Sequence, residues 1–305
     1  METKRTSQNL SIGGLWLPIV TPFQNGAVDL ASLRRLVRHY RDQPIDGLVL
    51  AGTTGEALTL NVDEISDIVR SVSDEQQEIG TPIPVLLGVS GSNTRKVIEY
   101  ISYTAGWPID GYLVSGPAYS RPSQVGLLSH FEAIADATTR PLVIYNIPYR
   151  TGVNLSNDAL IRLAGRDNVI GIKDCCADAE QTLDLLKRRP QNFAVMTGED
   201  LAYHAALCAG ADGAILSAAH LMTQEFAQVQ IDLFNGHVSE ARTKWYDLHD
   251  LTKLLFAEPS PGPLKHWLWR NGLIESRELR LPMTTISDVL AERIDTRAMA
   301  LTCSP

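Results

Sequence analysis

The stretch Asn168-Val169-Ile170-Gly171-Ile172-Lys173-Asp174 is apolar over most of its length and then ends at an amine. Such a short run is typical of a parallel β-strand buried on both faces, with Lys173 at its carboxyl end. Lysine is rare inside proteins unless its charge is paired or its pKa is lowered. A lysine of lowered pKa is a nucleophile that forms Schiff bases with carbonyl compounds. An isolated strand-end lysine is more often a surface residue, so the rest of the sequence must decide.

Short aliphatic runs of this kind recur along the chain and alternate with amphipathic stretches of helical periodicity. One helical stretch follows a predicted cap at Asp29, and another is opened by Asn61 with Glu64 three residues later, the pattern of a capping box. The spacing of the runs is that of βα units, which require a parallel sheet. The predicted strands are Leu15–Val20, Gly47–Leu50, Ile83–Leu87, Gly111–Val114, Pro141–Tyr145, Val169–Ile172, Phe193–Met196 and Gly213–Leu216.

This repeat predicts an α/β protein, specifically a (β/α)8 TIM barrel formed by residues 1–235. A doubly wound sheet is the competing architecture, but no Gly-rich dinucleotide turn follows the first run. After Gly236 the strand pattern stops. Residues 236–305 are predicted to form a C-terminal helical extension with helices at Ala241–Leu255, Pro263–Trp269 and Ile286–Met299.

Composition restricts the class of protein. The 305 residues include 44% hydrophobic side chains and carry a net charge of −8, which argues against a nucleic-acid or acidic-membrane partner. No apolar run is long enough to predict a membrane span. The cysteines show no CxxC or His/Cys spacing, so neither a zinc site nor a disulfide framework is predicted, and a reducing cytoplasm fits; they are Cys175, Cys176, Cys208 and Cys303.

In a barrel of this type, the active-site residues lie at the carboxyl ends of the strands. Those ends carry an amine, two phenols, two hydroxyls and a guanidinium, in Lys173, Tyr119, Tyr145, Thr53, Thr54 and Arg150. Each has an ordinary structural interpretation: a Thr-Thr-Gly run is usually a turn, a lone Tyr is usually a core phenol, and an Arg is often a surface ion pair. The joint occurrence of these residues at the strand ends is much less probable by accident than the occurrence of any one of them.

The same residues carry a resemblance to a known family. The chain resembles the class I, Schiff-base-forming aldolases of the dihydrodipicolinate synthase and N-acetylneuraminate lyase family, from Gly14 to about Val289. Five runs support this resemblance, and Arg150 within the third of them favours the synthase branch. They are Val20-Thr21-Pro22-Phe23, Gly52-Thr53-Thr54-Gly55-Glu56, Tyr145-Asn146-Ile147-Pro148-Tyr149-Arg150-Thr151-Gly152, Gly171-Ile172-Lys173-Asp174 and Leu279-Arg280-Leu281-Pro282-Met283.

The resemblance implies a lyase that needs no cofactor or metal, because the lysine itself forms the covalent intermediate. Lys173 would form an imine with pyruvate, and the derived enamine would add to an aldehyde co-substrate, L-aspartate 4-semialdehyde. The product would be 4-hydroxytetrahydrodipicolinate, in lysine and diaminopimelate biosynthesis. Tyr145 would move protons through Thr53 and Tyr119.

Further roles follow from the resemblance alone. The N–H groups of Thr53 and Thr54 would hold the pyruvate carboxylate, Arg150 would hold the second carboxylate, and Gly198 and the Ile215 carbonyl would line the pyruvate side. Because Tyr119 belongs to a loop that completes the neighbouring subunit's site in relatives, a homotetramer built from two tight dimers is implied.

Several positions depart from the family's pattern. One tyrosine of the strand-four loop is replaced by Ala118, Tyr149 stands where a small residue is common, and Cys175-Cys176 follows the lysine strand. A related 2-keto acid aldolase or dehydratase acting on a sugar acid is therefore an alternative, and a non-catalytic ligand-sensing paralogue is another. In relatives, feedback lysine binds in a cleft at the tight-dimer interface. The matching positions here are Ala57, Leu58, Val62 and Ile65, with no serine or histidine among them, then Ser92 where asparagine is common, Lys96 where a glutamate binds the amine, and Ala118 in place of the tyrosine. Inhibition by lysine is therefore not expected.

Overall fold

The structure is a computed structural model that describes residues 10–80 and 82–302. Its contacts divide the chain into two compact units. The first unit contains residues 84–215 together with the chain before Leu15, and the second contains residues 15–83 and 216–305.

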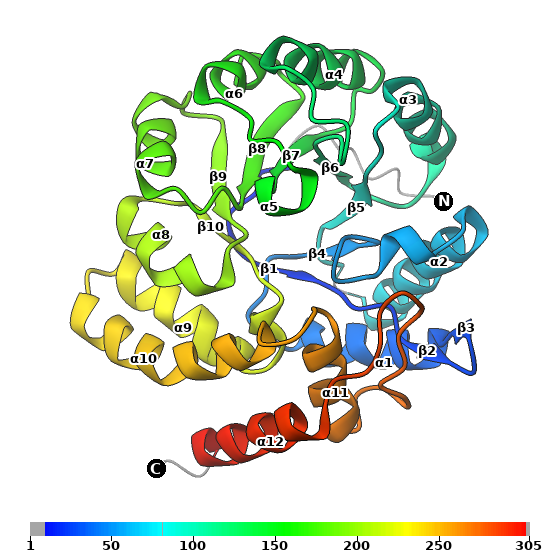
Figure 1. Ribbon diagram of the computed structural model, residues 1–305, viewed down its shortest axis with the longest axis vertical. Helices are drawn as coiled ribbons and strands as arrows, with labels where there is room; N and C mark the ends of the chain where they lie inside the picture. Colours follow the sequence, from blue (N-terminus) through cyan, green and yellow to red (C-terminus); the bar gives the residue numbers. More distant parts are fainter. Residues whose placement is uncertain (1–9, 81, 303–305) are drawn as a thin grey trace. The chain divides into compact units, whose positions relative to one another are not determined.

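The first unit is a run of parallel strands covered by helices on its outer side (Figure 1). Its strands are almost wholly buried aliphatic segments, as expected for parallel strands that are covered on both faces. The strands are β5 (Val85–Val89), β6 (Gly111–Ser115), β7 (Leu142–Asn146), β8 (Val169–Asp174), β9 (Ala194–Thr197) and β10 (Gly213–Ile215). The helices are α3 (Thr94–Tyr103), α4 (Gln124–Asp136), α5 (Pro148–Thr151), α6 (Asn157–Ala164), α7 (Ala179–Arg188) and α8 (Tyr203–Ala209), with 3₁₀ turns η3 (Thr104–Gly106) and η4 (Asp200–Ala202).

The second unit pairs two strands in parallel and adds a short hairpin and the helices that follow β10. Asp29 caps its first helix, and Asn61 and Glu64 form the complete capping box that the sequence predicts. Its strands are β1 (Gly14–Pro18), β2 (Phe23–Gln24), β3 (Ala27–Val28) and β4 (Gly47–Leu50). Its helices are α1 (Leu30–Arg41), α2 (Val62–Ile79), α9 (Thr223–Phe234), α10 (Val238–Leu255), α11 (Gly262–Arg270) and α12 (Asp288–Thr302), with 3₁₀ turns η2 (Ala57–Thr59) and η5 (Ala218–His220).

The strand order confirms the predicted fold class. The eight parallel strands follow one another as β1-β10-β9-β8-β7-β6-β5-β4 in a closed barrel, with helices between successive strands. All eight predicted strands are present, with ends shifted by at most two residues. The three predicted C-terminal helices correspond to α10, α11 and α12.

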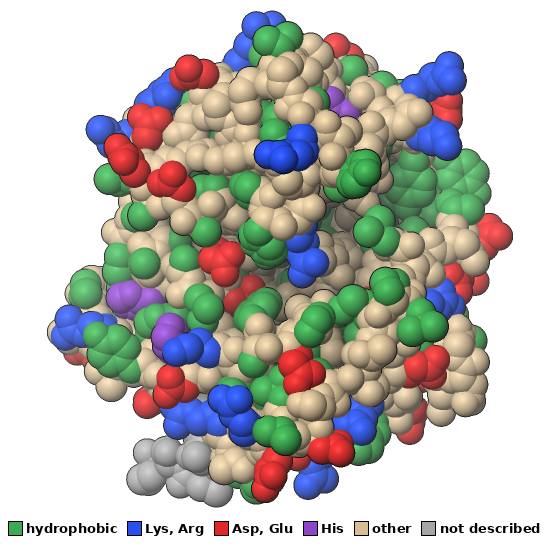
Figure 2. All heavy atoms as spheres, viewed as in Figure 1, with side chains coloured by type: hydrophobic (Ala, Val, Ile, Leu, Met, Phe, Trp, Pro, Cys, Tyr) green, Lys and Arg blue, Asp and Glu red, His purple; other side chains and the backbone are tan. Residues whose placement is uncertain are grey.

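The outer helices of the first unit carry charges of both signs close together. Acidic and basic side chains alternate over α6 and α7 (Figure 2), where Arg188 pairs with Asp158 and with Asp184. Such exposed pairs contribute little to stability but keep the surface hydrated. None of the helices in the described part of the chain is long and apolar enough to cross a membrane.

Candidate active site

The centre of the site is a lysine–tyrosine pair on adjacent strands. Tyr145 of β7 lies opposite Lys173 of β8 in the parallel register, and the Lys173 Nζ lies 4.4 Å from the centre of the Tyr145 ring. Both side chains are buried, and Lys173 is only 6% exposed. Two functional groups that the sequence places far apart are thus brought together by strand pairing.

The strand and the following turn explain why Lys173 is so closely surrounded. Side chains two residues apart on a strand share a face, so Cys175 projects on the same side as Lys173. A Cβ atom at Gly198 would lie 2.3 Å from Lys173 Cε and 2.6 Å from the Cys175 sulfur. Only glycine fits at position 198, because the lysine stem occupies the space of a side chain. Gly198 is held there by its N–H, which donates to the Asp174 carbonyl at 2.8 Å.

This environment lowers the pKa of Lys173. Burial is the main cause, and the positive charge of Arg150 acts in the same direction. The carboxylates of Asp200 and Glu199 oppose the shift by favouring the ammonium form. The net effect is a larger fraction of free amine near neutrality than an ordinary lysine has.

The two cysteines after the lysine strand have separate roles, which the sequence alone did not explain. The buried Cys175 thiol fills the space beside Lys173 and Gly198, and burial strongly raises its pKa, so it stays a protonated, inert thiol. Cys176 faces the other way and donates from its thiol to Asp174 at 3.2 Å. Burial raises the pKa of Cys176 to about 11.

An amide network fixes the loop that follows β7. The buried Asn146 donates to the Asn154 side chain at 2.9 Å and accepts from the Leu155 N–H at 3.2 Å. Gly152 ends the short helix α5 in the left-handed region, at φ 79°, where glycine is favoured. The turn between these anchors carries Tyr149 and Arg150.

Arg150 and Tyr149 form an exposed pair on that turn. The guanidinium carbon of Arg150 lies 5.7 Å from the centre of the Tyr149 ring. Partial desolvation, with the negative charge of Glu199, raises the pKa of Tyr149 to about 12. Tyr149 is therefore a neutral phenol at physiological pH, and the Arg150 guanidinium keeps its charge available to an anion.

Tyr119 is placed differently from the other predicted site residues. It lies in the loop after β6, where its backbone takes φ 69° and its side chain is 97% exposed. Its N–H donates to the Thr151 carbonyl at 3.2 Å, so this loop is tied to the turn that carries Arg150. A tyrosine with positive φ is uncommon and marks a loop whose shape is imposed by its surroundings.

The second unit holds the Thr-Thr turn after β4. The buried Thr54 hydroxyl lies 2.7 Å from the Ser217 hydroxyl, while Thr53 is exposed. The turn closes on itself through hydrogen bonds from the Gly55 N–H to the Gly52 carbonyl and from the Glu56 N–H to the Thr53 carbonyl, both 3.1 Å. Within this unit, over the residues that the structure describes, neither the Thr53 nor the Thr54 N–H has an acceptor. Two free N–H groups in succession are suited to an anion.

The remaining predicted residue, Ile215, is buried at the end of β10. Three residues near Lys173 were not predicted: Cys175, Glu199 and Asp200. Alternation along β8 was a signal for Cys175, whereas the charge interactions of Glu199 and Asp200 depend on the turn geometry after β9. No group of three or more His, Cys, Asp or Glu side chains in the described part of the chain is arranged to hold a metal ion.

Comparisons with known proteins identify the family of this chain. The protein named 4-hydroxy-tetrahydrodipicolinate synthase 2 from Clostridium acetobutylicum is 39% identical over 286 residues, which cover 94% of this chain and 99% of that protein. The dihydrodipicolinate synthase structure from Thermotoga maritima superposes with a TM-score of 0.91 at 32% identity, covering 95% of this chain and 99% of that one. A structure of the enzyme from Cyanidioschyzon merolae with lysine bound gives a TM-score of 0.91 at 30% identity, covering 96% and 99%. The sequence model of the dihydrodipicolinate synthetase family matches residues 11–299, and the chain belongs to this family.

Proposed function

We propose that this enzyme, a lyase with class I aldolase chemistry, condenses pyruvate with L-aspartate 4-semialdehyde to give 4-hydroxytetrahydrodipicolinate. The observation that carries the proposal is the buried Lys173 amine of lowered pKa, packed against the Tyr145 ring. The relatives named as synthases of this product support the same reaction. It belongs to lysine and diaminopimelate biosynthesis.

The covalent steps begin at Lys173. Its neutral Nζ attacks the ketone carbon of pyruvate, water leaves, and a protonated imine forms. The imine draws electrons from the methyl group, so a methyl proton leaves and an enamine results. Because the imine itself is the electron sink, the reaction needs no resident cofactor.

The second half of the reaction consumes the enamine. Its terminal carbon adds to the aldehyde carbon of the semialdehyde, and the aldehyde oxygen takes up a proton. The amino group of the semialdehyde then attacks the imine carbon, closes the ring and releases Lys173. Tyr145 carries the protons, in a relay with Thr53 and Tyr119, since a phenol of ordinary pKa near 10 exchanges protons slowly alone.

Recognition of the two carboxylates is divided between two turns. The free N–H groups of Thr53 and Thr54 hold the pyruvate carboxylate. Arg150, which is exposed on its turn, holds the carboxylate of the semialdehyde in a bidentate pair. Gly198 and the Ile215 carbonyl line the pyruvate side. In a TIM barrel, residues at the carboxyl ends of different strands serve one site.

We further propose a cytoplasmic homotetramer, a dimer of dimers in which Tyr119 completes the site of a neighbouring subunit. The exposed, strained position of Tyr119 supports this role. Residues 1–235 supply the barrel and its chemistry, and residues 236–305 supply a helical extension. The changed cleft positions Lys96 and Ala118 support an enzyme without lysine inhibition.

Chemical trapping tests the central assignment. Borohydride with pyruvate is expected to add one pyruvate-derived mass to the Lys173 peptide, and Lys173→Ala is expected to remove the label. Rates with aspartate semialdehyde, compared with a panel of other aldehydes and sugar acids, test the second substrate. Stoichiometric labelling of Lys173→Ala would contradict the covalent role, and a sugar acid preferred over the semialdehyde would contradict the proposed reaction.

A further inference from the structure

A second lysine is buried outside the group around Lys173. Lys265 of α11 is 0% exposed, and its Nζ lies 2.5 Å from Oε1 of the buried Glu56. The same ammonium donates to the Glu278 carbonyl at 2.8 Å and lies 4.2 Å from the centre of the Phe23 ring. Nothing in the proposed chemistry uses this amine.

Keeping this charge buried has a cost. Burial lowers the pKa of Lys265 to about 8, although Glu56 acts in the opposite direction. Buried ion pairs generally contribute little net stability compared with apolar residues of similar size, whereas removing one partner is strongly destabilising. Net stability therefore does not explain why the chain buries this ion pair. The position in which the pair holds Glu56 explains it better.

Glu56 has a backbone conformation that needs support. Its φ is 52°, in the left-handed region that glutamate rarely adopts. Its two carboxylate oxygens have different partners: Oε1 faces Lys265, and Oε2 accepts from the Arg280 N–H at 3.1 Å. The side chain is thus held at both oxygens, which fixes the backbone from which it projects.

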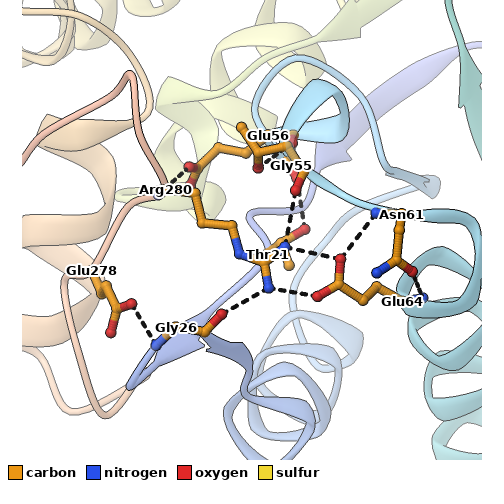
Figure 3. A network of polar contacts seen from close by, with 9 residues as sticks. Thr21, Gly26, Gly55, Glu56, Asn61, Glu64, Glu278 and Arg280 are labelled. Atoms are coloured by element: carbon orange, nitrogen blue, oxygen red, sulfur yellow. Dashed lines mark hydrogen bonds and ion pairs between the residues drawn. The ribbon is translucent and has the colours of Figure 1, made fainter.

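Glu56 ends the turn that presents the two free N–H groups. Its own N–H donates to the Thr53 carbonyl at 3.1 Å, so its position sets the closure of the turn. The neighbouring Gly55 carbonyl accepts from the Thr21 hydroxyl at 2.7 Å (Figure 3). Both residues that end the turn, Gly55 and Glu56, are therefore anchored, and neither anchor occupies the Thr53 and Thr54 N–H groups.

Arg280 connects this anchor to α2. Its guanidinium donates to Glu64 and to the Thr59 carbonyl, each at 2.9 Å, and to the Gly26 carbonyl at 2.8 Å (Figure 3). Glu64 belongs to the capping box of α2, so Arg280 fixes the segment from Glu56 to Glu64 at both of its ends.

We propose that the Lys265–Glu56 pair is a positioning element that holds the Thr53–Thr54 turn in its anion-binding shape. This inference rests on the proposed role of that turn in holding the pyruvate carboxylate. Lys265 and Glu56 touch neither substrate; they act on pyruvate recognition through the backbone. The C-terminal helix α11 thereby contributes to substrate selection.

A comparison of two ketones tests this role. Pyruvate and hydroxyacetone both present a methyl ketone to Lys173, but only pyruvate has a carboxylate. The preference is the ratio of the two borohydride trapping rates. Lys265→Met is expected to lower this preference at least about tenfold, because the trapping rate of pyruvate falls while that of hydroxyacetone stays the same. The matched control is Lys244→Met, which removes another lysine–carboxylate pair of the same unit, Lys244–Asp232 at 2.7 Å, and is expected to leave the preference unchanged.

A double variant separates positioning from stability. Lys265→Met leaves Glu56 as a buried unpaired charge, which is strongly destabilising by itself, whereas Lys265→Met combined with Glu56→Gln buries no charge. The double variant is expected to recover thermal stability but to keep the reduced preference. A folded double variant with a preference within about twofold of the parent enzyme would overturn the inference. A parent enzyme that shows no preference for pyruvate would instead contradict the carboxylate role of the turn, and the inference would fall with it.

Discussion

Lys173 owes the lowered pKa of its amine mainly to three neighbours that pack around it. Gly198 leaves room for the lysine stem, Cys175 fills the remaining space with an un-ionised thiol, and Tyr145 places an aromatic face at the amine. Together they exclude water and leave the ammonium poorly solvated, which is the main reason that the pKa of Lys173 falls. A nucleophilic amine near neutral pH therefore needs this packing as much as it needs the lysine.

Replacement of Tyr145 by Phe tests the proton relay. The ring that faces the amine is kept and only the hydroxyl is lost, so the fold is expected to persist while kcat falls about 10²- to 10⁴-fold. Tyr112→Phe is the matched control, because the Tyr112 hydroxyl is also buried and lies 3.0 Å from Thr104 but belongs to no proposed step. Steady-state rates measure both variants. A Tyr145→Phe enzyme as active as the control would contradict the relay.

Arg150 is expected to act in two separable ways. Arg150→Ala removes a positive charge that lowers the pKa of Lys173, so the pH profile of pyruvate trapping should shift to higher pH. It also removes the partner of the substrate carboxylate, so kcat/KM for the semialdehyde should fall by an amount that corresponds to about 1.5–3 kcal/mol. Arg150→Lys keeps the charge and loses the bidentate geometry, so it should affect only the second quantity. An Arg150→Ala enzyme with unchanged kcat/KM would exclude the carboxylate role.

At the scale of elements, strands and caps were predictable because their signals are local. Buried aliphatic runs predicted every barrel strand, and Asn61 with Glu64 predicted the start of α2. The β2–β3 hairpin was not predicted, although its Asn25-Gly26 turn carried a signal. Both turn residues have positive φ, 52° and 80°, which is the reason that Asn-Gly is favoured in two-residue hairpins.

The candidate site was only partly predictable for a related reason. Lys173, Tyr145 and Arg150 occur in runs whose residue types suggest chemistry. Lys265 and Glu56 are more than two hundred positions apart, and no local pattern predicts that a helix near the end of the chain pairs with a turn after β4. Burial of a lysine in such a pair is a property of tertiary packing.

The junction between η5 and α1 is expected to weaken in acid. The buried His220 ring donates from Nδ1 to the Ser217 carbonyl at 2.9 Å and packs edge-on against Tyr40, with ring centroids 5.0 Å apart. Burial lowers its pKa from 6.5 to about 4. Between these two pH values the unfolded chain binds a proton that the folded chain does not, so stability falls as pH falls through that window.

The expected loss is at most about 1.4 kcal/mol for each pH unit below 6.5. Urea unfolding at pH 7 and pH 5 measures it. His220→Gln removes the titration and should flatten the dependence across the window. An equal loss of stability in His220→Gln and in the parent enzyme would assign the acid sensitivity to other groups.

At the scale of the whole molecule, the conformation of the loop after β6 predicts that the protein forms an oligomer. Tyr119 and Arg121 both have positive φ, 69° and 45°, and the Tyr119 phenol is exposed in the single chain. Holding an apolar ring in solvent on a strained backbone is unfavourable unless another surface covers it. Sedimentation is expected to give a tetramer, and Tyr119→Phe should lower kcat while the tetramer persists. A fully active monomer would contradict the role of this loop.

A second prediction about the oligomer is that L-lysine does not inhibit the enzyme. A bound lysine ligand needs an anion for its ammonium group and polar partners for its carboxylate. Lys96 is exposed on α3 and supplies a cation where an anion is needed, and Ser92 already donates to the Ala118 carbonyl at 2.6 Å. Like charges in a partly desolvated cleft oppose binding by roughly a few kcal/mol. Calorimetry with millimolar L-lysine should therefore show no binding, and activity should be unchanged.

A variant that restores the missing groups makes this prediction sharper. Ser92→Asn, Lys96→Glu and Ala118→Tyr together return an amide, an anion and a phenol to the cleft, and the triple variant is expected to bind lysine where the parent enzyme does not. Reversing the charge at Lys96 alone should give weaker binding, because the carboxylate of the ligand would still lack the phenol. Lysine binding to the parent enzyme with a parallel loss of activity would show that the cleft recognises its ligand through other residues, and the argument from charge would be wrong.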